Sequence, residues 1–140
     1  MIEIGNHGRT IIDSEVVDIE KKFNVIFPEE YRAFLLKFNG GTPEFCSIDI
    51  PGMEDSPTDV KVFFGIDRKY ETSNIDWNIQ LLNEFEFDIP LLPIASDSGG
   101  SIFCIECGSN NVVFLDMNES PCAVYEVAKT FEEFLSAIRE

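Results

Sequence analysis

Apolar positions recur at helical spacing most clearly in residues 28–38. The spacing i, i+3, i+4, i+7 places these side chains on one face of a helix, as expected for a face buried in a core. Pro28 suits the first helical position, and Asn39-Gly40-Gly41 predicts the end, since glycine accepts the left-handed conformation that follows a helix. The apolar face consists of Tyr31, Phe34, Leu35 and Phe38.

Three further segments show helical patterns. Residues 13–23 predict a first helix, which Asp13 or Ser14 can cap, and residues 74–85 predict a third. The last helix is expected at about residues 131–139, where Thr130 and Glu133 form a T-x-x-E capping box. Its inward side chains are Phe131, Phe134, Leu135 and Ile138.

Short runs rich in β-branched and aromatic residues predict strands between these helices. We expect the strands at residues 45–50, 60–66, 101–107, 112–116 and 123–127. The acidic, Pro- and Gly-containing segment 51–59 joins the first two, and Gly108-Ser109-Asn110-Asn111 predicts a hairpin turn.

Strands clustered in hairpins between helices favour an α+β fold over a parallel α/β sheet. We therefore expect a twisted, largely antiparallel sheet with helices packed against it. The length of 140 residues is typical of one domain, and no repeat or linker divides the chain. The expected domain is 1–140, with residues 1–12 as an N-terminal extension or first strand.

The charge of the chain is strongly unbalanced. Asp and Glu number 26 against 10 Lys and Arg, a net charge of −16, and no basic residue lies between Lys69 and Lys129. Such a field repels nucleic acids and anionic membranes. It attracts basic partners and speeds their association, although acidity also serves solubility alone.

The N-terminus lacks the pattern of a signal peptide, and no apolar stretch is long enough to cross a bilayer. We therefore expect a cytoplasmic protein; a monomer is favoured, and the oligomeric state stays open. Its four cysteines are then expected to be reduced thiols. They are Cys46, Cys104, Cys107 and Cys122.

No set of residues supports catalysis. The single histidine, His7, lies in a turn near the N-terminus, so a Ser/His/Asp or Cys/His arrangement would depend on it. Cys104-Ile-Glu-Cys107 resembles half of a zinc site, but a second pair is missing and strand pleating would separate the two thiols. We expect no enzyme activity, no metal and no cofactor.

Two further motifs predict structure rather than chemistry. The run beginning at Asp116 starts like a calcium loop, but it has Pro121 where the turn needs glycine and Val127 where a glutamate should ligate. The run Ser96-Asp97-Ser98-Gly99-Gly100-Ser101 has no lysine for phosphate and precedes a strand. It predicts a tight turn in which Asp97 accepts hydrogen bonds from backbone amides.

Three stretches resemble the SUKH superfamily, or Smi/Knr-like family. Residues 27–35 with Asn39-Gly40-Gly41 are similar to the family's L-P-x-x-Y-x-x-F-L … N-G-G pattern, with Phe27 in place of Leu. Residues 89–100 resemble its I-P … P-I-A-x-D-x-G-G turn, and residues 127–135 its A-x-S-F-x-E-F-L final helix. Their order and spacing match across about residues 13–139.

The resemblance implies the SUKH fold and a non-enzymatic binding protein. Many bacterial members resemble immunity proteins that bind and block a cognate toxin of contact-dependent or polymorphic systems, often a basic nuclease. Other members act as interaction hubs in cell-wall regulation, so a housekeeping interaction module stays open. Family-motif positions expected to be architectural are Pro28, Tyr31, Asn39, Gly40, Pro93, Asp97, Gly100 and Phe134.

Recognition of a basic toxin domain is expected at acidic side chains of the connecting segments, which carry binding more often than cores do. Beside them, Trp77, Phe64 and Tyr70 are candidate aromatic anchors, with core packing as the alternative. The candidate partner-binding residues are Asp55, Asp59, Asp67, Glu71, Asp76 and Trp77.

Overall fold

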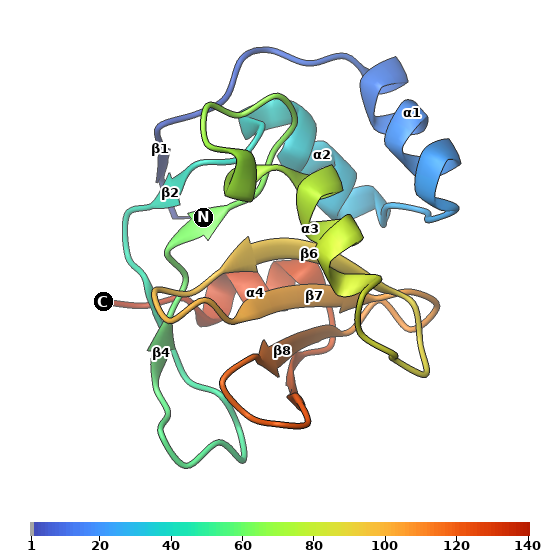
Figure 1. The fold of residues 1–140 in the computed structure, drawn as a ribbon. Helices are drawn as coiled ribbons and strands as arrows, with labels where there is room; N and C mark the ends of the chain where they lie inside the picture. The colour runs from blue at the N-terminus through green and yellow to red at the C-terminus, as the bar shows by residue number, and fades with distance from the viewer. Residues whose placement is uncertain (1) are drawn as a thin grey trace.

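The computed structural model describes residues 2–140, which form an α+β domain (Figure 1). Its helices are α1 (Asp13–Phe23), α2 (Glu29–Phe38), α3 (Ile75–Leu82) and α4 (Phe131–Ala137), with a short 3-10 helix, η1 (Glu71–Ser73). Its strands are β1 (Ile4–Gly5), β2 (Thr42–Pro43), β3 (Ser47–Ile48), β4 (Thr58–Asp59), β5 (Val62–Phe63), β6 (Leu91–Ser96), β7 (Ile102–Glu106), β8 (Val112–Asp116) and β9 (Ala123–Ala128). The predicted fold class is confirmed.

The main sheet has five strands in the order β5-β6-β7-β8-β9, and every neighbouring pair is antiparallel. Figure 1 shows α3 in front of this sheet and α4 behind it, so both faces are covered by a helix. Two small antiparallel pairs, β1-β2 and β3-β4, lie outside the main sheet. Within residues 1–12, expected as an N-terminal extension or first strand, Ile4–Gly5 forms β1.

Aromatic rings join α2, α4 and the sheet. Phe34 of α2 lies 5.1 Å from Phe131 and 5.0 Å from Phe63 between ring centroids. Phe134 of α4 lies 5.2 Å from Phe103 of β7, and all of these rings are buried. Such tilted and edge-on pairs are favourable beyond their buried area, which gives many of the 13 phenylalanines a structural role.

The strands that precede α3 are shorter than predicted. Of residues 45–50 only Ser47–Ile48 is a strand, and of residues 60–66 only Val62–Phe63. Within the predicted connection 51–59, Thr58–Asp59 forms β4. The apolar pattern of these segments predicts which residues are buried better than it predicts which residues form strands. Ile50 and Val60 are buried although neither lies in a strand.

The predicted helix positions are largely correct, and their ends differ. The third helix stops at Leu82 rather than residue 85, and α4 stops at Ala137 because Arg139 exchanges backbone hydrogen bonds with Ser47. At α1, neither Asp13 nor Ser14 is the N-cap. Ile12 occupies that position, and the carboxylate of Glu15 accepts a hydrogen bond from its N–H at 2.9 Å.

The end of α2 connects three segments of the chain. Asn39 adopts the left-handed conformation and is buried, and its side chain bonds to the backbone of Arg9 and Ile66. Gly40 follows with φ +84°, and an added Cβ would lie 2.8 Å from the carbonyl oxygen of Phe63. This position therefore requires glycine on both conformational and steric grounds.

The other α-helical motif positions are also structural. Pro28, predicted as the first helical residue, is the N-cap of α2, which begins one residue later at Glu29, and its carbonyl accepts a bond from Arg32 N. Tyr31 is buried between Phe27 and Phe131, and Phe134 is fully buried. In β6, Pro93 lies at the point where the pairing with β7 shifts register, which suits a residue without an N–H.

The turn after β6 is built as the sequence predicts. Asp97 Oδ1 accepts hydrogen bonds from Gly99 N at 3.0 Å and Ser101 N at 2.7 Å. Its other oxygen accepts from the Thr58 hydroxyl at 2.8 Å, which fastens the turn to β4. Gly100 has φ +89° and supplies the left-handed residue of the turn.

Candidate interaction face

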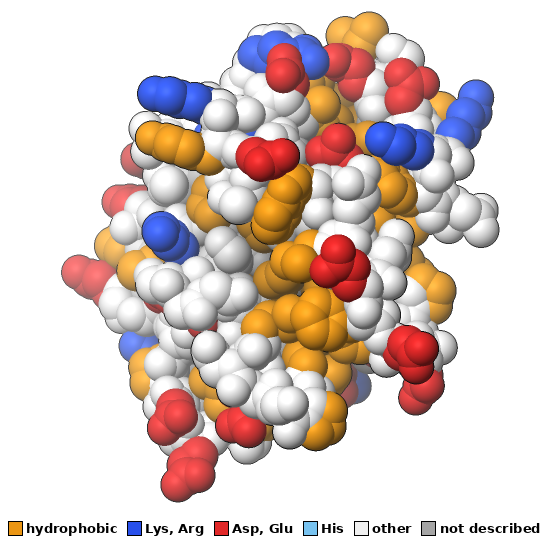
Figure 2. Space-filling view, in the orientation of Figure 1, with side chains coloured by type: hydrophobic (Ala, Val, Ile, Leu, Met, Phe, Trp, Pro, Cys, Tyr) orange, Lys and Arg blue, Asp and Glu red, His pale blue; other side chains and the backbone are white. Residues whose placement is uncertain are grey.

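Two hollows meet at Trp77 on the outer side of α3. Trp77 and Leu81 are four residues apart and both half-buried, whereas Ile75 and Ile79 point into the core. Figure 2 shows hydrophobic side chains gathered in the middle of this face, with acidic side chains around them. We call the two hollows together the Trp77 face.

The first hollow is acidic and has a volume of about 450 Å³. Three of the predicted partner-binding carboxylates line it together with Trp77, although they come from separate turns of the chain. Its lining residues are Ile19, Ile66, Asp67, Glu71, Asn74, Asp76, Trp77 and Gln80. A ring beside several carboxylates favours a cationic side chain.

The second hollow is larger, about 630 Å³, and more apolar. The Asp97 turn forms one side, and the exposed Tyr70 ring lies at the other. Trp77 lines both hollows, so a partner that reaches it touches acidic and apolar surface at once. Its apolar walls are Val62, Phe64, Tyr70, Trp77, Leu81 and Ile102.

Two asparagines of the α3 region hold the loop that carries these carboxylates. Asn74 Oδ1 accepts from Arg68 N at 2.7 Å, and its amide donates to the carbonyls of Tyr70 and Glu71. The buried Asn78 donates to the carbonyl of Thr72 at 3.0 Å. These bonds fix the loop before α3, so Glu71 is presented on an ordered backbone.

One of the acidic side chains is already paired within the chain. Arg9 Nε lies 3.0 Å from Asp67 Oδ2, and Arg9 also binds Glu15. These contacts raise the pKa of Arg9, Glu15 acting first and Asp67 second. Glu71 and Asp76 form no ion pair within residues 2–140, so they are the carboxylates of this hollow that a basic partner meets unpaired.

The remaining predicted binding residues lie elsewhere. Asp59 accepts hydrogen bonds from the backbone N–H and the hydroxyl of Ser98, and so holds the Asp97 turn. Asp55 is exposed in the loop between β3 and β4 and lines neither hollow. Phe64 is 2% exposed, so the alternative of core packing is correct for this ring.

Within residues 2–140, the hydrogen-bond partner of the His7 ring is the carbonyl of Ile4 and not a Ser, Cys or Asp side chain. His7 is exposed at Phe38, and the four cysteines are free thiols. Burial raises the pKa of Cys104 well above its ordinary value, which keeps that thiol protonated. Within residues 2–140, no three His, Cys, Asp or Glu side chains are arranged to hold a metal ion.

Sequence reasoning missed Leu81 and Gln80 as surface residues of this face. Their signal was present, because both lie on the side of the predicted helix opposite the inward Ile75 and Ile79. No helix in the described part of the chain is long and apolar enough to span a membrane.

The model of the SMI1/KNR4 family (SUKH-1) matches residues 11–137. The chain belongs to this family. Among curated proteins and among solved structures, nothing matches the chain significantly. The resemblance carried by the N-G-G, Asp97 and final-helix stretches is thereby confirmed.

In this SUKH-1 chain most family-motif positions lie in the core, whereas the Asp97 turn, with Gly100, also lines the Trp77 face. Asn39, Gly40 and Phe134 are buried and set the fold, whereas Glu71 and Gln80 are exposed. Membership of a family known for immunity and regulatory proteins is compatible with a binding role for the exposed set.

Proposed function

We propose that this SUKH-1 protein is a cytoplasmic immunity protein that binds a basic toxin domain through the Trp77 face and thereby blocks it. The observation that carries the proposal is the meeting of Glu71 and Asp76 with a half-buried tryptophan at one hollow. The net charge of −16 supports a basic partner, such as a nuclease domain whose substrate is polyanionic.

The mechanism is stoichiometric occlusion without chemistry. Long-range attraction between the acidic protein and a basic toxin speeds their encounter. At close range Trp77 and Tyr70 offer aromatic anchors, the residue type that most often carries binding energy in interfaces. Glu71 and Asp76 then pair with lysine or arginine side chains of the toxin.

The test is a capture from native lysate at low salt, followed by a wash at about 0.5 M salt, which shortens the Debye length to a few ångströms. The bait proteins are the wild type, Trp77→Ala combined with Asp76→Asn, and the control Glu119→Gln. The control also removes one negative charge, but at a residue outside both hollows. We expect one basic domain to be retained in stoichiometric amount by the wild type and the control only.

Co-expression of that captured domain with the protein then measures neutralisation. Protection by the wild type, and its loss with the Trp77/Asp76 variant, supports immunity. A partner that binds without being toxic, or that the variant retains equally, contradicts the proposal and favours the housekeeping interaction module. Alanine at Asp67, Glu71 or Asp76 should slow association and flatten its salt dependence.

A further inference from the structure

Strand β9 forms one edge of the main sheet. It pairs with β8 from Asp116↔Ala123 to Val112↔Ala128, and no strand within residues 2–140 lies on its other side. An unpaired edge presents free N–H and C=O groups to any chain that can add a further strand. Only some of the backbone groups of β9 are free, because the others bond to β8.

The pairing within the β7–β8 hairpin shows which backbone groups of β9 point away from the sheet. In an antiparallel pair, only every second residue directs its backbone groups at a given neighbour. Glu106 N donates to Asn111 O at 2.8 Å, which fixes the alternation between β7 and β8. Phe114 is consequently a residue of β8 that bonds to β9, and its partner there is Tyr125.

It follows that Val124 and Glu126 direct their N–H and C=O groups away from β8. Neither residue has another backbone hydrogen bond in the described part of the chain. The Val124 side chain is also open, with the residue 51% exposed. These two residues form a ready template for an added antiparallel or parallel strand.

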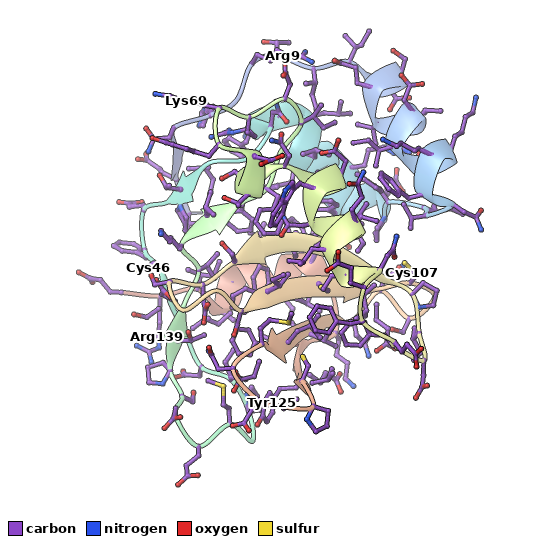
Figure 3. The ribbon with its side chains drawn as sticks, viewed as in Figure 1. Arg9, Cys46, Lys69, Cys107, Tyr125 and Arg139 are labelled. Carbon is purple, nitrogen blue, oxygen red and sulfur yellow. The ribbon has the colours of Figure 1, made fainter. Side chains whose placement is uncertain are left out.

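A groove of about 520 Å³ follows this edge. Consecutive residues from Val124 to Lys129 line it, with Pro51 and Glu133 as the opposing walls. Figure 3 shows Tyr125 near the loop between β3 and β4, and an added Cβ on Gly52 of that loop would lie 3.8 Å from its ring. The groove therefore has room for an extended segment beside β9.

The charges around the groove specify the occupant. Lys129 is bound to Glu126 at 2.8 Å, which leaves Glu133 as the acidic wall without an ion pair among the described residues. The loop that begins at Pro51 adds the exposed Glu54 and Asp55. A second copy of the chain would bring −16 against −16, so self-pairing is opposed and a basic segment is favoured.

We propose that β9 is a second binding surface, which accepts an extended lysine- or arginine-rich segment of a partner protein as an added strand. The backbone groups of Val124 and Glu126 supply the pairing, and Glu133 together with the exposed Glu54 and Asp55 selects a basic partner. This surface shares no lining residue with the Trp77 face. The proposal therefore does not depend on a toxin partner.

The experiment uses a capped peptide of alternating lysine and valine, about eight residues long, which is enough to span β9. Amide resonances of the ¹⁵N-labelled full chain are followed during titration at low salt. We expect the Val124 and Glu126 amides to shift and to gain protection from hydrogen exchange, while those of Trp77 and Glu71 stay unchanged. A peptide with glutamate in place of lysine should not bind.

Two variants at one site separate backbone pairing from side-chain contact. Val124→Pro removes an outward N–H, which an edge strand tolerates, whereas Val124→Ala keeps it. We expect Val124→Pro to weaken peptide binding about tenfold and Val124→Ala to leave it nearly unchanged. A peptide N-methylated at every residue, which has no N–H on either edge, should show the same loss of binding without any change to the protein.

Three outcomes overturn the proposal. The first is a set of shifts confined to the Trp77 face, and the second is equal binding by the N-methylated peptide. The third is a concentration-dependent dimer whose protected amides are those of Val124 and Glu126, because the edge would then serve a second copy.

Discussion

Asn39 and Ile66 bind each other through two hydrogen bonds of the kind that paired strands exchange. Ile66 N donates to Asn39 Oδ1 at 2.7 Å, and Asn39 Nδ2 donates to Ile66 O at 2.9 Å. The same amide donates to Arg9 O at 3.1 Å, and Asn39 is 1% exposed. One side chain thus links the end of α2 to the N-terminal segment at Arg9 and to the segment at Ile66, which lines the Trp77 face.

Asn39→Ala should therefore be strongly destabilising. The change leaves the part-buried N–H and C=O of Ile66 without their Asn39 partners and places alanine at φ 49°. We expect a loss of roughly 3 kcal/mol in the free energy of unfolding, from two to three lost bonds and the left-handed backbone. Urea denaturation followed by circular dichroism measures it.

Asn24 provides the matched control, because it ends α1 in the same conformation, with φ 55°, but is exposed. Asn24→Ala should cost only about 1 kcal/mol, the backbone contribution. Asn39→Gly should recover only about 1 kcal/mol relative to Asn39→Ala, since glycine relieves the conformation without restoring the bonds. Equal losses for Asn24→Ala and Asn39→Ala would contradict this account.

The Tyr31 hydroxyl is a buried polar group with no hydrogen-bond partner among residues 2–140. Burial alone raises the pKa of Tyr31 above its ordinary value. Removing the oxygen ends an uncompensated desolvation cost, so we expect Tyr31→Phe to raise the free energy of unfolding by about 1 kcal/mol. A clear loss of stability on denaturation would instead point to a bound water or another partner for this hydroxyl.

Glu15 links acid stability to the N-terminal segment. The Arg9 guanidinium and the Ile12 N–H hold the pKa of Glu15 below its ordinary value of 4.5. The folded state therefore gains stability from the ionised carboxylate above pH 4.5 and loses it as the pH falls through the lower folded pKa.

Glu15→Gln should therefore make the melting temperature depend less on pH in the acid range. Below the folded and unfolded pKa values of Glu15, the carboxyl group is protonated in both states, so the substitution should have little effect there. Asp18→Asn on the same helix is the control, since Asp18 forms no ion pair among the described residues. Thermal scans across the acid range compare the three proteins. Identical profiles for both variants would refute the role of Arg9.

Trp77 is the only tryptophan, so its fluorescence measures the field of the acidic hollow directly. Caesium should quench it more effectively than iodide, because Glu71 and Asp76 attract cations and repel anions. The double variant Glu71→Gln with Asp76→Asn should reduce the difference between caesium and iodide quenching of Trp77. Glu119→Gln with Asp18→Asn loses the same charge elsewhere, and an equal narrowing there would show that only the net charge matters.

The helices could be predicted well because each carries its own apolar face. Residues 13–23 form α1 over the predicted range, and α4 begins at Phe131, after a Thr130 hydroxyl that accepts from Glu133 N at 3.1 Å. Their ends were less predictable. Arg139 leaves the helical pattern because the backbone of Ser47, far away in sequence, offers it hydrogen bonds.

Strands depended more on tertiary partners. Residues 112–116 form β8 as predicted, whereas β6 was not predicted as a strand, because Pro90 and Pro93 interrupt its pattern. The bulge at Pro93 and the short pairing of β6 with β5 let the sheet accept that proline. Local residue propensities could not predict β6, because its strand pairing depends on β5 and β7, which are its neighbours in the sheet.

The α+β class, the family motifs, the helical apolar faces and the acidic balance could all be predicted before the fold was known, because they depend on local spacing and residue type. The placement of the acidic side chains depends instead on long-range contacts: Glu71 and Asp76 share a hollow with Trp77, whereas Asp59 holds a turn and Asp55 lies elsewhere. Surface charges carry no periodic signal, and their grouping follows from how loops fold onto the sheet.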